Sequence, residues 1–336
     1  MNRTFPPERT YRDIISEAWM RTLEIQSARD DQNFFDAGGN SVLLVQLQRS
    51  LTAGLGFKVP LQEIFRHPTI ADLSRRVETL APSPAPVGRQ ELNLYCLPYA
   101  GCSARVFDSW KVYAPEFLNV IPVELPGRGS RCTDSPVSDL PELLDDLSSA
   151  IDVDSRVPYG IFGHSFGAII AYELGRRMIA DGFPGPSALV VSACRPPHLA
   201  TPEVPVFDRP DRDFRQRLRE LRGTPPELLE NDELMELYIP VIRADYSIID
   251  NYRSAGPVDI GCPIVALYGS ADDDADGAVV EQWGAYTRSS FEKYEIPGDH
   301  FFLHSAEQEI VSRIASEISL GIPSAARLGR IAEKGA

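Results

Sequence analysis

A serine framed by two glycines is the feature that most restricts how this chain can fold. Residues 160–167 read Gly-Ile-Phe-Gly-His-Ser-Phe-Gly, which places Ser165 at the centre of a Gly-x-Ser-x-Gly pattern. The residues before it, 156–162, read as a short buried strand, and residues 168–178 carry apolar side chains at helical spacing. Small residues on both sides of the serine let a strand and a helix approach closely through a strained turn. The pattern therefore predicts a strand–serine–helix unit with the hydroxyl exposed.

Other apolar runs of strand length alternate with helical stretches in the second part of the chain. They comprise residues 92–97, 120–125, 188–192, 264–268 and 291–296. This alternation predicts an α/β domain with a mostly parallel sheet and helices on both faces. A strand–serine–helix unit in such a domain is the nucleophile elbow of an α/β-hydrolase, so we expect a serine acyl-transfer enzyme.

Charge and cysteine content restrict the function further. The net charge of −15 argues against a nucleic-acid-binding protein, and it arises after residue 80, because the first 80 residues are balanced. No apolar run approaches the ~20 residues that span a bilayer. The five cysteines form neither a disulfide framework nor a metal-ligand pattern, which predicts reduced thiols in a cytoplasmic protein and no bound metal.

The first part of the chain shows helical periodicity only. Apolar stripes run through residues 14–23, 42–51 and 70–77, and Thr69 is placed to cap the last of them. Residues 81–91 are rich in proline and alanine without apolar periodicity, as in a linker. We expect a small all-α bundle of four helices over residues 8–80, a hydrolase domain over 92–320 and a flexible tail over 321–336.

The helical segment contains a loop with a distinctive motif, Phe34-Phe-Asp-x-Gly-Gly-x-Ser41-x-Leu-Leu44. From physics alone, Ser41 reads as a helix N-cap. The motif, however, resembles that of the peptidyl carrier domains of non-ribosomal peptide synthetases, as does Phe65-x-x-Pro-Thr69 further on. This resemblance implies that a phosphopantetheinyl transferase attaches 4'-phosphopantetheine to Ser41, where it carries an acyl chain as a thioester.

Acyl transfer by a serine needs a histidine base, and in α/β-hydrolases the acid and then the histidine follow the serine. His67 lies in the helical domain, His164 is turned away from the adjacent nucleophile, and His198 comes too early. His300 follows the strand-like segment 291–296 directly, so it is the expected base. His304, four residues later and expected on the following helix, is the alternative.

The acid that orients the base should follow the strand at residues 264–268. Four carboxylates occupy this segment within residues 272–276. By register Asp272 is the expected acid, with Asp273 and Asp274 as near alternatives. A calcium loop is a rival use of these carboxylates, but the spacing fits no EF-hand.

An oxyanion hole needs two backbone N–H donors. Its position in the fold predicts Phe166, directly after the nucleophile, as the first donor. The second should come from the loop after residues 92–97, from Ala100 or, alternatively, Tyr99.

Four motifs of the second domain together resemble the thioesterases of peptide and polyketide synthesis. They read Pro98-Tyr-Ala-Gly-x-Ser, Pro126-Gly-Arg-Gly, Gly163-His-Ser-Phe-Gly and Pro297-Gly-Asp-His-Phe-Phe-Leu. The late acid and a helical lid at about residues 198–252, with Arg243-Ala-Asp-Tyr246, resemble the discrete type II, or editing, branch. Asp272-Asp273 replaces the usual Asp-Pro of that branch.

The two resemblances imply a carrier–thioesterase didomain that ends the non-ribosomal synthesis of a peptide, such as an antibiotic. The acyl or peptidyl group on the Ser41 arm would pass to Ser165 and leave by hydrolysis or cyclisation. Upstream condensation and adenylation domains would be its partners. An editing thioesterase, a non-catalytic docking module and a general esterase are the alternatives. The start near the beginning of a carrier domain favours a piece of a longer synthetase over a free-standing didomain.

Overall fold

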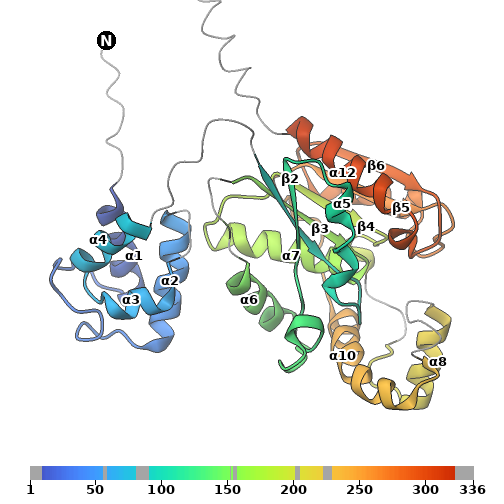
Figure 1. Ribbon diagram of the computed structural model, residues 1–336, viewed down its shortest axis with the longest axis horizontal. Helices are drawn as coiled ribbons and strands as arrows, with labels where there is room; N and C mark the ends of the chain where they lie inside the picture. The colour runs from blue at the N-terminus through green and yellow to red at the C-terminus, as the bar shows by residue number, and fades with distance from the viewer. Residues whose placement is uncertain are drawn as a thin grey trace, which may run out of the picture. The chain divides into compact units, whose positions relative to one another are not determined.

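A computed structural model describes residues 10–55, 59–80, 91–151, 153, 157–200, 205–221 and 229–321. Within them the chain forms two compact units (Figure 1). The first consists mainly of residues before Gln90, and the second contains most of the residues after Arg89. The predicted linker lies outside the described residues except for Glu91, and the predicted tail lies outside them except for Gly321.

The first unit is helical, as the apolar stripes predict. Its helices are α1 (Tyr11–Leu23), α2 (Ser41–Leu55), α3 (Leu61–Arg66) and α4 (Ile70–Leu80). The Thr10 hydroxyl accepts the Asp13 N–H at the start of α1. The Thr69 hydroxyl accepts the Asp72 N–H at the start of α4, where the sequence predicts a cap. The prediction of a small all-α bundle is therefore confirmed.

Two aromatic rings lie at the centre of this bundle. Trp19 and Phe34 are fully buried and meet edge to face, with ring centroids 5.0 Å apart. Gly39 lies so close to Phe34 that a Cβ atom at this position would lie 2.3 Å from a ring carbon. The loop that leads to Ser41 is therefore held against the core by its aromatic residue.

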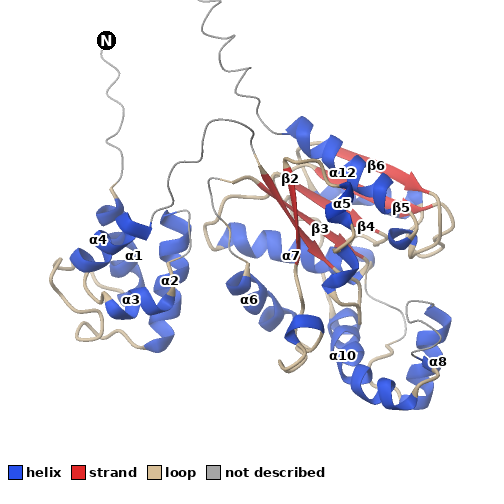
Figure 2. Cartoon of the chain, viewed as in Figure 1, coloured by secondary structure: helices blue, strands red, loops and turns tan. Residues whose placement is uncertain are grey.

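The second unit contains a six-stranded sheet in which all neighbouring strands are parallel (Figure 2). The strands are β1 (Leu92–Leu97), β2 (Leu118–Pro122), β3 (Tyr159–His164), β4 (Ala188–Ser192), β5 (Ile264–Gly269) and β6 (Phe291–Ile296). Their order across the sheet is β2-β1-β3-β4-β5-β6. The observed β2 begins and ends earlier than the predicted segment 120–125, because its pairing with β1 runs from Leu118 to Pro122.

Helices cover both faces of this sheet. Phe162 points into one core together with Ile314 of α12 (Glu307–Gly321) and Trp110 of α5 (Trp110–Tyr113). Ile161 points to the opposite face, where it lies close to Gly175 of α7 (Phe166–Ala180). Helices α6 (Leu140–Ala150) and α11 (Gly277–Val280) are the other α-helices described outside the lid. In the described part of this unit, five short 3-10 helices lie between these elements: η1 (Ala104–Phe107), η2 (Gly129–Arg131), η3 (Pro197–Leu199), η4 (Glu281–Tyr286) and η5 (Phe302–His304).

The chain segment that connects β4 to β5 includes two described helices, which form a layer apart from the sheet (Figure 1). Helices α8 (Asp211–Leu221) and α10 (Asp232–Asn251) share a small apolar core that includes Phe214, Leu218 and Met235. This layer falls within the predicted lid, residues 198–252.

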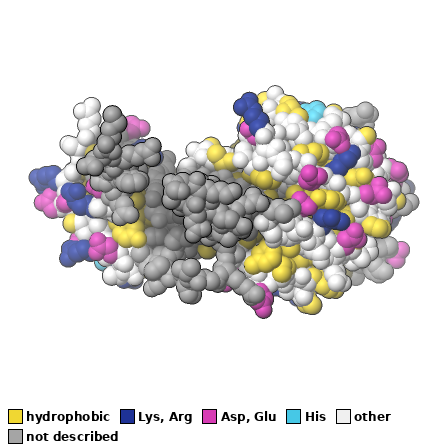
Figure 3. Space-filling view, turned by 90° about the horizontal axis from the view of Figure 1, so that it is seen from above, with side chains coloured by type: hydrophobic (Ala, Val, Ile, Leu, Met, Phe, Trp, Pro, Cys, Tyr) yellow, Lys and Arg dark blue, Asp and Glu magenta, His cyan; other side chains and the backbone are white. Residues whose placement is uncertain are grey.

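Acidic and basic side chains are interspersed on the face shown in Figure 3, with no basic patch among its described residues. No helix in the described part of the chain is both long and apolar enough to cross a bilayer. All five cysteines are free; Cys132 is exposed, Cys102 is half-buried, and Cys96, Cys194 and Cys262 are buried.

Candidate active site and carrier serine

The turn between β3 and α7 holds Ser165 in a left-handed conformation, with φ of 53°. Glycines are needed on both sides of it. A Cβ atom at Gly163 would lie 2.1 Å from the carbonyl oxygen of Gly167, and one at Gly167 would lie 2.3 Å from the carbonyl oxygen of Leu97. The Gly-x-Ser-x-Gly pattern therefore follows from the close approach of three backbone segments, as the elbow requires.

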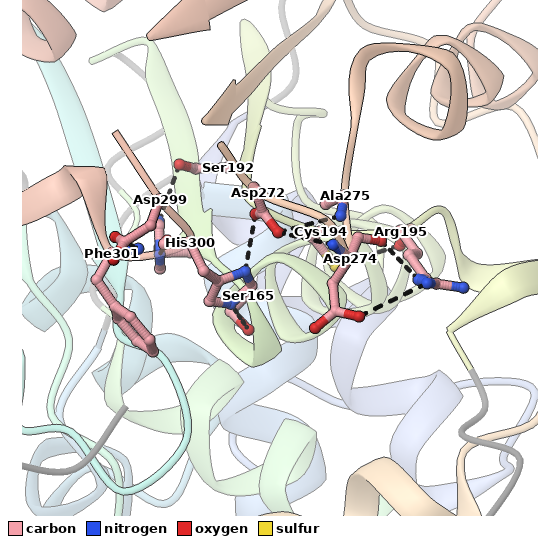
Figure 4. A network of polar contacts seen from close by, with 11 residues as sticks. Ser165, Ser192, Cys194, Arg195, Asp272, Asp274, Ala275, Asp299, His300 and Phe301 are labelled. Carbon is pink, nitrogen blue, oxygen red and sulfur yellow. Dashed lines mark hydrogen bonds and ion pairs between the residues drawn. The ribbon is translucent and has the colours of Figure 1, made fainter. Parts of the chain in front are cut away.

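Three side chains that follow three different strands meet in one hydrogen-bonded chain (Figure 4). His300, in the loop after β6, lies with Nε2 3.0 Å from Ser165 Oγ. Its Nδ1 lies 2.8 Å from Oδ2 of Asp272, in the turn after β5. The structure thus brings together the three residues that the sequence singled out as nucleophile, base and acid.

The environment of Asp272 keeps it ionised. Burial acts to raise the pKa of this carboxyl group, but the hydrogen bond and charge of His300 and the N–H groups of Asp274 and Ala275 outweigh burial, so the net shift is downward. An ionised carboxylate only accepts hydrogen bonds. His300 therefore donates through Nδ1, and its Nε2 is left to accept the proton of Ser165 Oγ.

The neighbouring carboxylates lie elsewhere. Asp274 Oδ1 lies 3.7 Å from Nη2 of Arg195, whose Nε donates to the Asp274 carbonyl oxygen, and Asp273 is exposed. The described residues contain no cluster of three or more histidine, cysteine or carboxylate side chains arranged to hold a metal.

The alternative histidines have other partners. His198 stacks on Tyr286 and bonds to its hydroxyl. His304 lies 3.1 Å from the hydroxyl of Tyr99 and belongs to the 3-10 helix η5 rather than to the following α-helix, which begins only at Glu307. His67 lies in the first unit.

His164 has a position that sequence reasoning missed. Its side chain is fully buried, with Nε2 2.9 Å from the backbone oxygen of His300 and Nδ1 2.9 Å from Ser192 Oγ. A carbonyl oxygen only accepts, so Nε2 carries the proton and Nδ1 accepts from the serine. His164 therefore supports the backbone of the loop that presents His300.

The two predicted oxyanion donors lie beside Ser165. Phe166 is the first residue of α7, so its N–H has no acceptor within the helix. Ala100 lies in a turn closed by the hydrogen bond from the Cys102 N–H to the Tyr99 carbonyl oxygen. Phe166, Ala100 and Tyr99 all line the same cavity as Ser165.

That cavity has a volume of about 450 Å³. Apolar side chains from both the hydrolase body and the lid line it: Phe166, Ile169, Leu218, Ile242 and Ile249. Polar side chains line it as well: Arg195, Arg217, Glu220, Tyr246 and Asp274. A wall that is more apolar than polar suits an acyl chain of small-molecule size.

In the first unit, Ser41 is the exposed first residue of α2. The capping role belongs to its neighbour, because Asn40 Oδ1 accepts the N–H groups of Val42 and Leu43, each at 3.0 Å. Among the described residues the Ser41 hydroxyl makes no hydrogen bond. The interpretation of Ser41 as an ordinary N-cap is therefore wrong.

Comparison with known protein families matches two models to the chain. The thioesterase domain matches residues 92–318, and the phosphopantetheine attachment site matches residues 13–77.

Similar proteins include two whose names refer to gramicidin and one solved type II thioesterase. "Linear gramicidin dehydrogenase LgrE" of Brevibacillus parabrevis is 34% identical over 239 residues, which cover 70% of this chain and 91% of that protein. "Gramicidin S biosynthesis protein GrsT" of Aneurinibacillus migulanus is 32% identical, over 68% of this chain and 90% of that protein. The solved structure of YbtT, described as a type II thioesterase from the yersiniabactin pathway, superposes with a TM-score of 0.62 at 30% identity, covering 71% of this chain and 97% of YbtT.

Proposed function

The chain belongs to the thioesterase domain family and carries a phosphopantetheine attachment domain, and we propose that it releases an acyl or peptidyl group from a carrier thioester through Ser165. The chain of hydrogen bonds from Ser165 through His300 to Asp272, beside a cavity of acyl size, supports this proposal most directly. We propose the division into a carrier domain (8–80), a linker (81–91), a hydrolase (92–320) with its lid (198–252), and a tail (321–336).

The environment of Ser41 fits a phosphopantetheine arm. The hydroxyl is exposed and, among the described residues, unbonded, at the N-terminal end of a 15-residue helix. The positive end of the helix dipole favours a phosphodiester there. When attached, the arm supplies the thiol that holds the acyl group as a thioester. We propose that a phosphopantetheinyl transferase attaches it.

The first half of the reaction transfers the acyl group to the enzyme. Ser165 Oγ attacks the thioester carbonyl carbon while His300 Nε2 takes the hydroxyl proton. The backbone N–H groups of Phe166 and Ala100 would stabilise the negative charge on the carbonyl oxygen, and one such donor contributes a factor of about 10²–10³ in rate. The C–S bond then breaks, His300 returns its proton to the departing sulfur, and an ester remains on Ser165.

The second half releases the product. His300 takes a proton from water, which attacks the ester carbonyl carbon, and the bond to Ser165 Oγ breaks as His300 reprotonates that oxygen. An internal amine or hydroxyl in place of water would give a cyclic product. Throughout, Asp272 keeps His300 in the required tautomer and stabilises its charged form.

Covalent connection of the two domains would favour transfer within one chain, because a tethered acyl group reaches an effective concentration in the millimolar range. The upstream condensation and adenylation domains of a synthetase would then supply the acyl group. We place this chemistry in the cytoplasm, where free cysteines such as the five here stay reduced.

Editing of carrier domains is the second candidate. The likeness to YbtT, described as a type II thioesterase, favours it. An editing enzyme would remove aberrant acyl groups from several carriers, whereas a terminal thioesterase would act on the group carried by its own Ser41.

Intact-mass measurement tests the proposal. The wild type is incubated with a short acyl-coenzyme A and a phosphopantetheinyl transferase, and the acylated arm is followed over time. We expect attachment in the wild type and none in Ser41→Ala. Acyl loss should occur in the wild type and stop in Ser165→Ala, and equal loss in both would refute the role of Ser165.

Mixing the two variants separates the two candidates. Acylated Ser165→Ala supplies the carrier, and Ser41→Ala supplies the hydrolase. Slow transfer between chains that rises with concentration, together with fast, concentration-independent loss within the wild-type chain, supports terminal release. Transfer between chains as fast as loss within one chain supports editing.

A further inference from the structure

A buried ion pair joins the lid to the loop that follows β2. Arg128, in the Pro126-Gly-Arg-Gly motif, donates from Nη1 and Nη2 to the two carboxylate oxygens of Asp245 in α10, at 2.6 and 2.7 Å. The exposed fractions of the two side chains are 4% and 2%. These residues are 117 positions apart in the sequence.

The same carboxylate also holds the turn that contains Ala100. Asp245 Oδ2 accepts the N–H of Gly101 at 2.7 Å. Gly101 has φ of 75°, and a Cβ atom there would lie 2.9 Å from Ile242, one helical turn before Asp245. The turn therefore rests on α10 at two adjacent positions, one apolar and one charged.

The pair has an electrostatic consequence for the oxyanion. An unpaired Asp245 carboxylate beside this turn would oppose negative charge that develops near Ala100, and the Arg128 guanidinium neutralises that carboxylate. A buried ion pair adds little to the free energy of unfolding, because the cost of desolvating the two charges offsets most of their attraction. A bidentate pair, by contrast, fixes geometry.

We propose that Arg128 and Asp245 are positioning residues that hold the Tyr99–Cys102 turn, and with it the Ala100 N–H, in the orientation that stabilises the oxyanion. This inference rests on the proposed function. Helix α10 also contributes Ile242, Tyr246 and Ile249 to the acyl cavity. The ion pair therefore makes the orientation of the Ala100 N–H depend on the position of this lid helix.

The Asp245→Asn variant of the full chain tests the proposal, and Asp250→Asn is the matched control. Asp250 is also a buried carboxylate of α10, but it accepts the N–H groups of Val206 and Phe207, away from the oxyanion loop. Steady-state hydrolysis of a short acyl-coenzyme A gives KM and kcat, with kcat calculated from the concentration of folded enzyme. The inhibition constant of phenylboronic acid, which forms a tetrahedral anionic adduct on a nucleophilic serine, reports on the oxyanion hole.

For Asp245→Asn we expect kcat to fall about 10- to 100-fold with KM within about twofold, and the boronate inhibition constant to rise by a similar factor. Asp250→Asn should leave kcat and boronate binding within about threefold, even where its melting temperature falls. Arg128→Lys, which keeps the positive charge but loses the bidentate contact, should be intermediate in both kinetic readouts, and it provides the test if Asp245→Asn does not fold.

Equal losses of kcat and boronate affinity in Asp245→Asn and Asp250→Asn would overturn the proposal, because the effect would then belong to the lid as a whole. Unchanged kcat per folded Asp245→Asn, or unchanged kcat in Arg128→Lys, would overturn it as well. Failure of the proposed function would look different, because the Ser165→Ala variant would then hydrolyse acyl-coenzyme A as fast as the wild type.

Discussion

Replacement of His164 by glutamine should remove a defined part of the pH dependence of the hydrolase's stability. Burial is the largest cause that lowers the pKa of the His164 imidazole to about 3, and the nearby His300 is the second. The imidazole is therefore neutral in the folded protein at any pH near neutrality, in the tautomer that bridges Ser192 and the His300 carbonyl group.

The size and sign of the effect follow from the two pKa values. An unfolded chain protonates this imidazole with a pKa of about 6.5. Because the folded-state pKa is lower, the unfolded state binds more protons between these values, and stability falls as the pH falls from about 6.5 toward 3. For this one group, the loss between pH 8 and pH 5 amounts to about 2 kcal/mol.

The assay uses urea unfolding at pH 8 and pH 5, followed by tryptophan fluorescence. A Trp19→Phe background leaves only Trp110 and Trp283, both buried in the second unit, as reporters. Other titrating groups contribute to both proteins, so they cancel in the comparison of wild type with His164→Gln. We expect stability to fall by about 2 kcal/mol more in the protein that keeps His164. Equal pH dependence of the two would refute the assignment of a buried neutral imidazole.

Three further predictions concern the site and the carrier. Asp272→Asn should lower kcat for acyl-thioester hydrolysis by about 10³–10⁴, because an amide favours the wrong tautomer of the His300 base. The control Asp273→Asn should keep kcat within about twofold of the wild type. Similar losses of kcat in both variants would contradict the choice of acid. Gly163→Ala should reduce soluble yield and melting temperature, because its Cβ would lie 2.1 Å from a backbone oxygen; a wild-type melting curve would contradict the elbow geometry. Gly39→Ala should lower the unfolding midpoint of the carrier, measured by hydrogen exchange of its peptides, while hydrolysis of acyl-coenzyme A stays unchanged. Loss of hydrolysis in that variant would mean that the two units do not fold independently.

Much of the fold could be predicted because local patterns determine it. The strands at 92–97, 188–192 and 291–296 have the predicted bounds, since each is a short apolar or alternating run beside turn residues. For the second strand, the apolar run at 120–125 lies two to three residues after the observed bounds, Leu118–Pro122. Its ends depend on which residues of β1 pair with it, and this register is not visible in its own sequence.

The candidate site could likewise be predicted only in part. Ser165 and His300 could be selected from motifs and chain order, and Asp272 from its place after β5. The turn directs His164 away from the adjacent Ser165, so its sequence position indicates no role in the site. Its partner, the His300 carbonyl group, lies 136 residues away in the sequence. Likewise Arg128 and Asp245 stand in motifs that could be recognised, but no local signal pairs them.

The distribution of free cysteines makes the arm thiol chemically addressable. Burial raises the pKa of Cys194 and Cys262 to about 12 and that of Cys102 to about 11, and it raises that of Cys96 as well. Maleimides react with accessible thiolates, so these four side chains are poor targets. In a Cys132→Ser chain, a fluorescent maleimide would then label the phosphopantetheine sulfur selectively, and the movement of the carrier arm could be followed by spectroscopy in the intact protein.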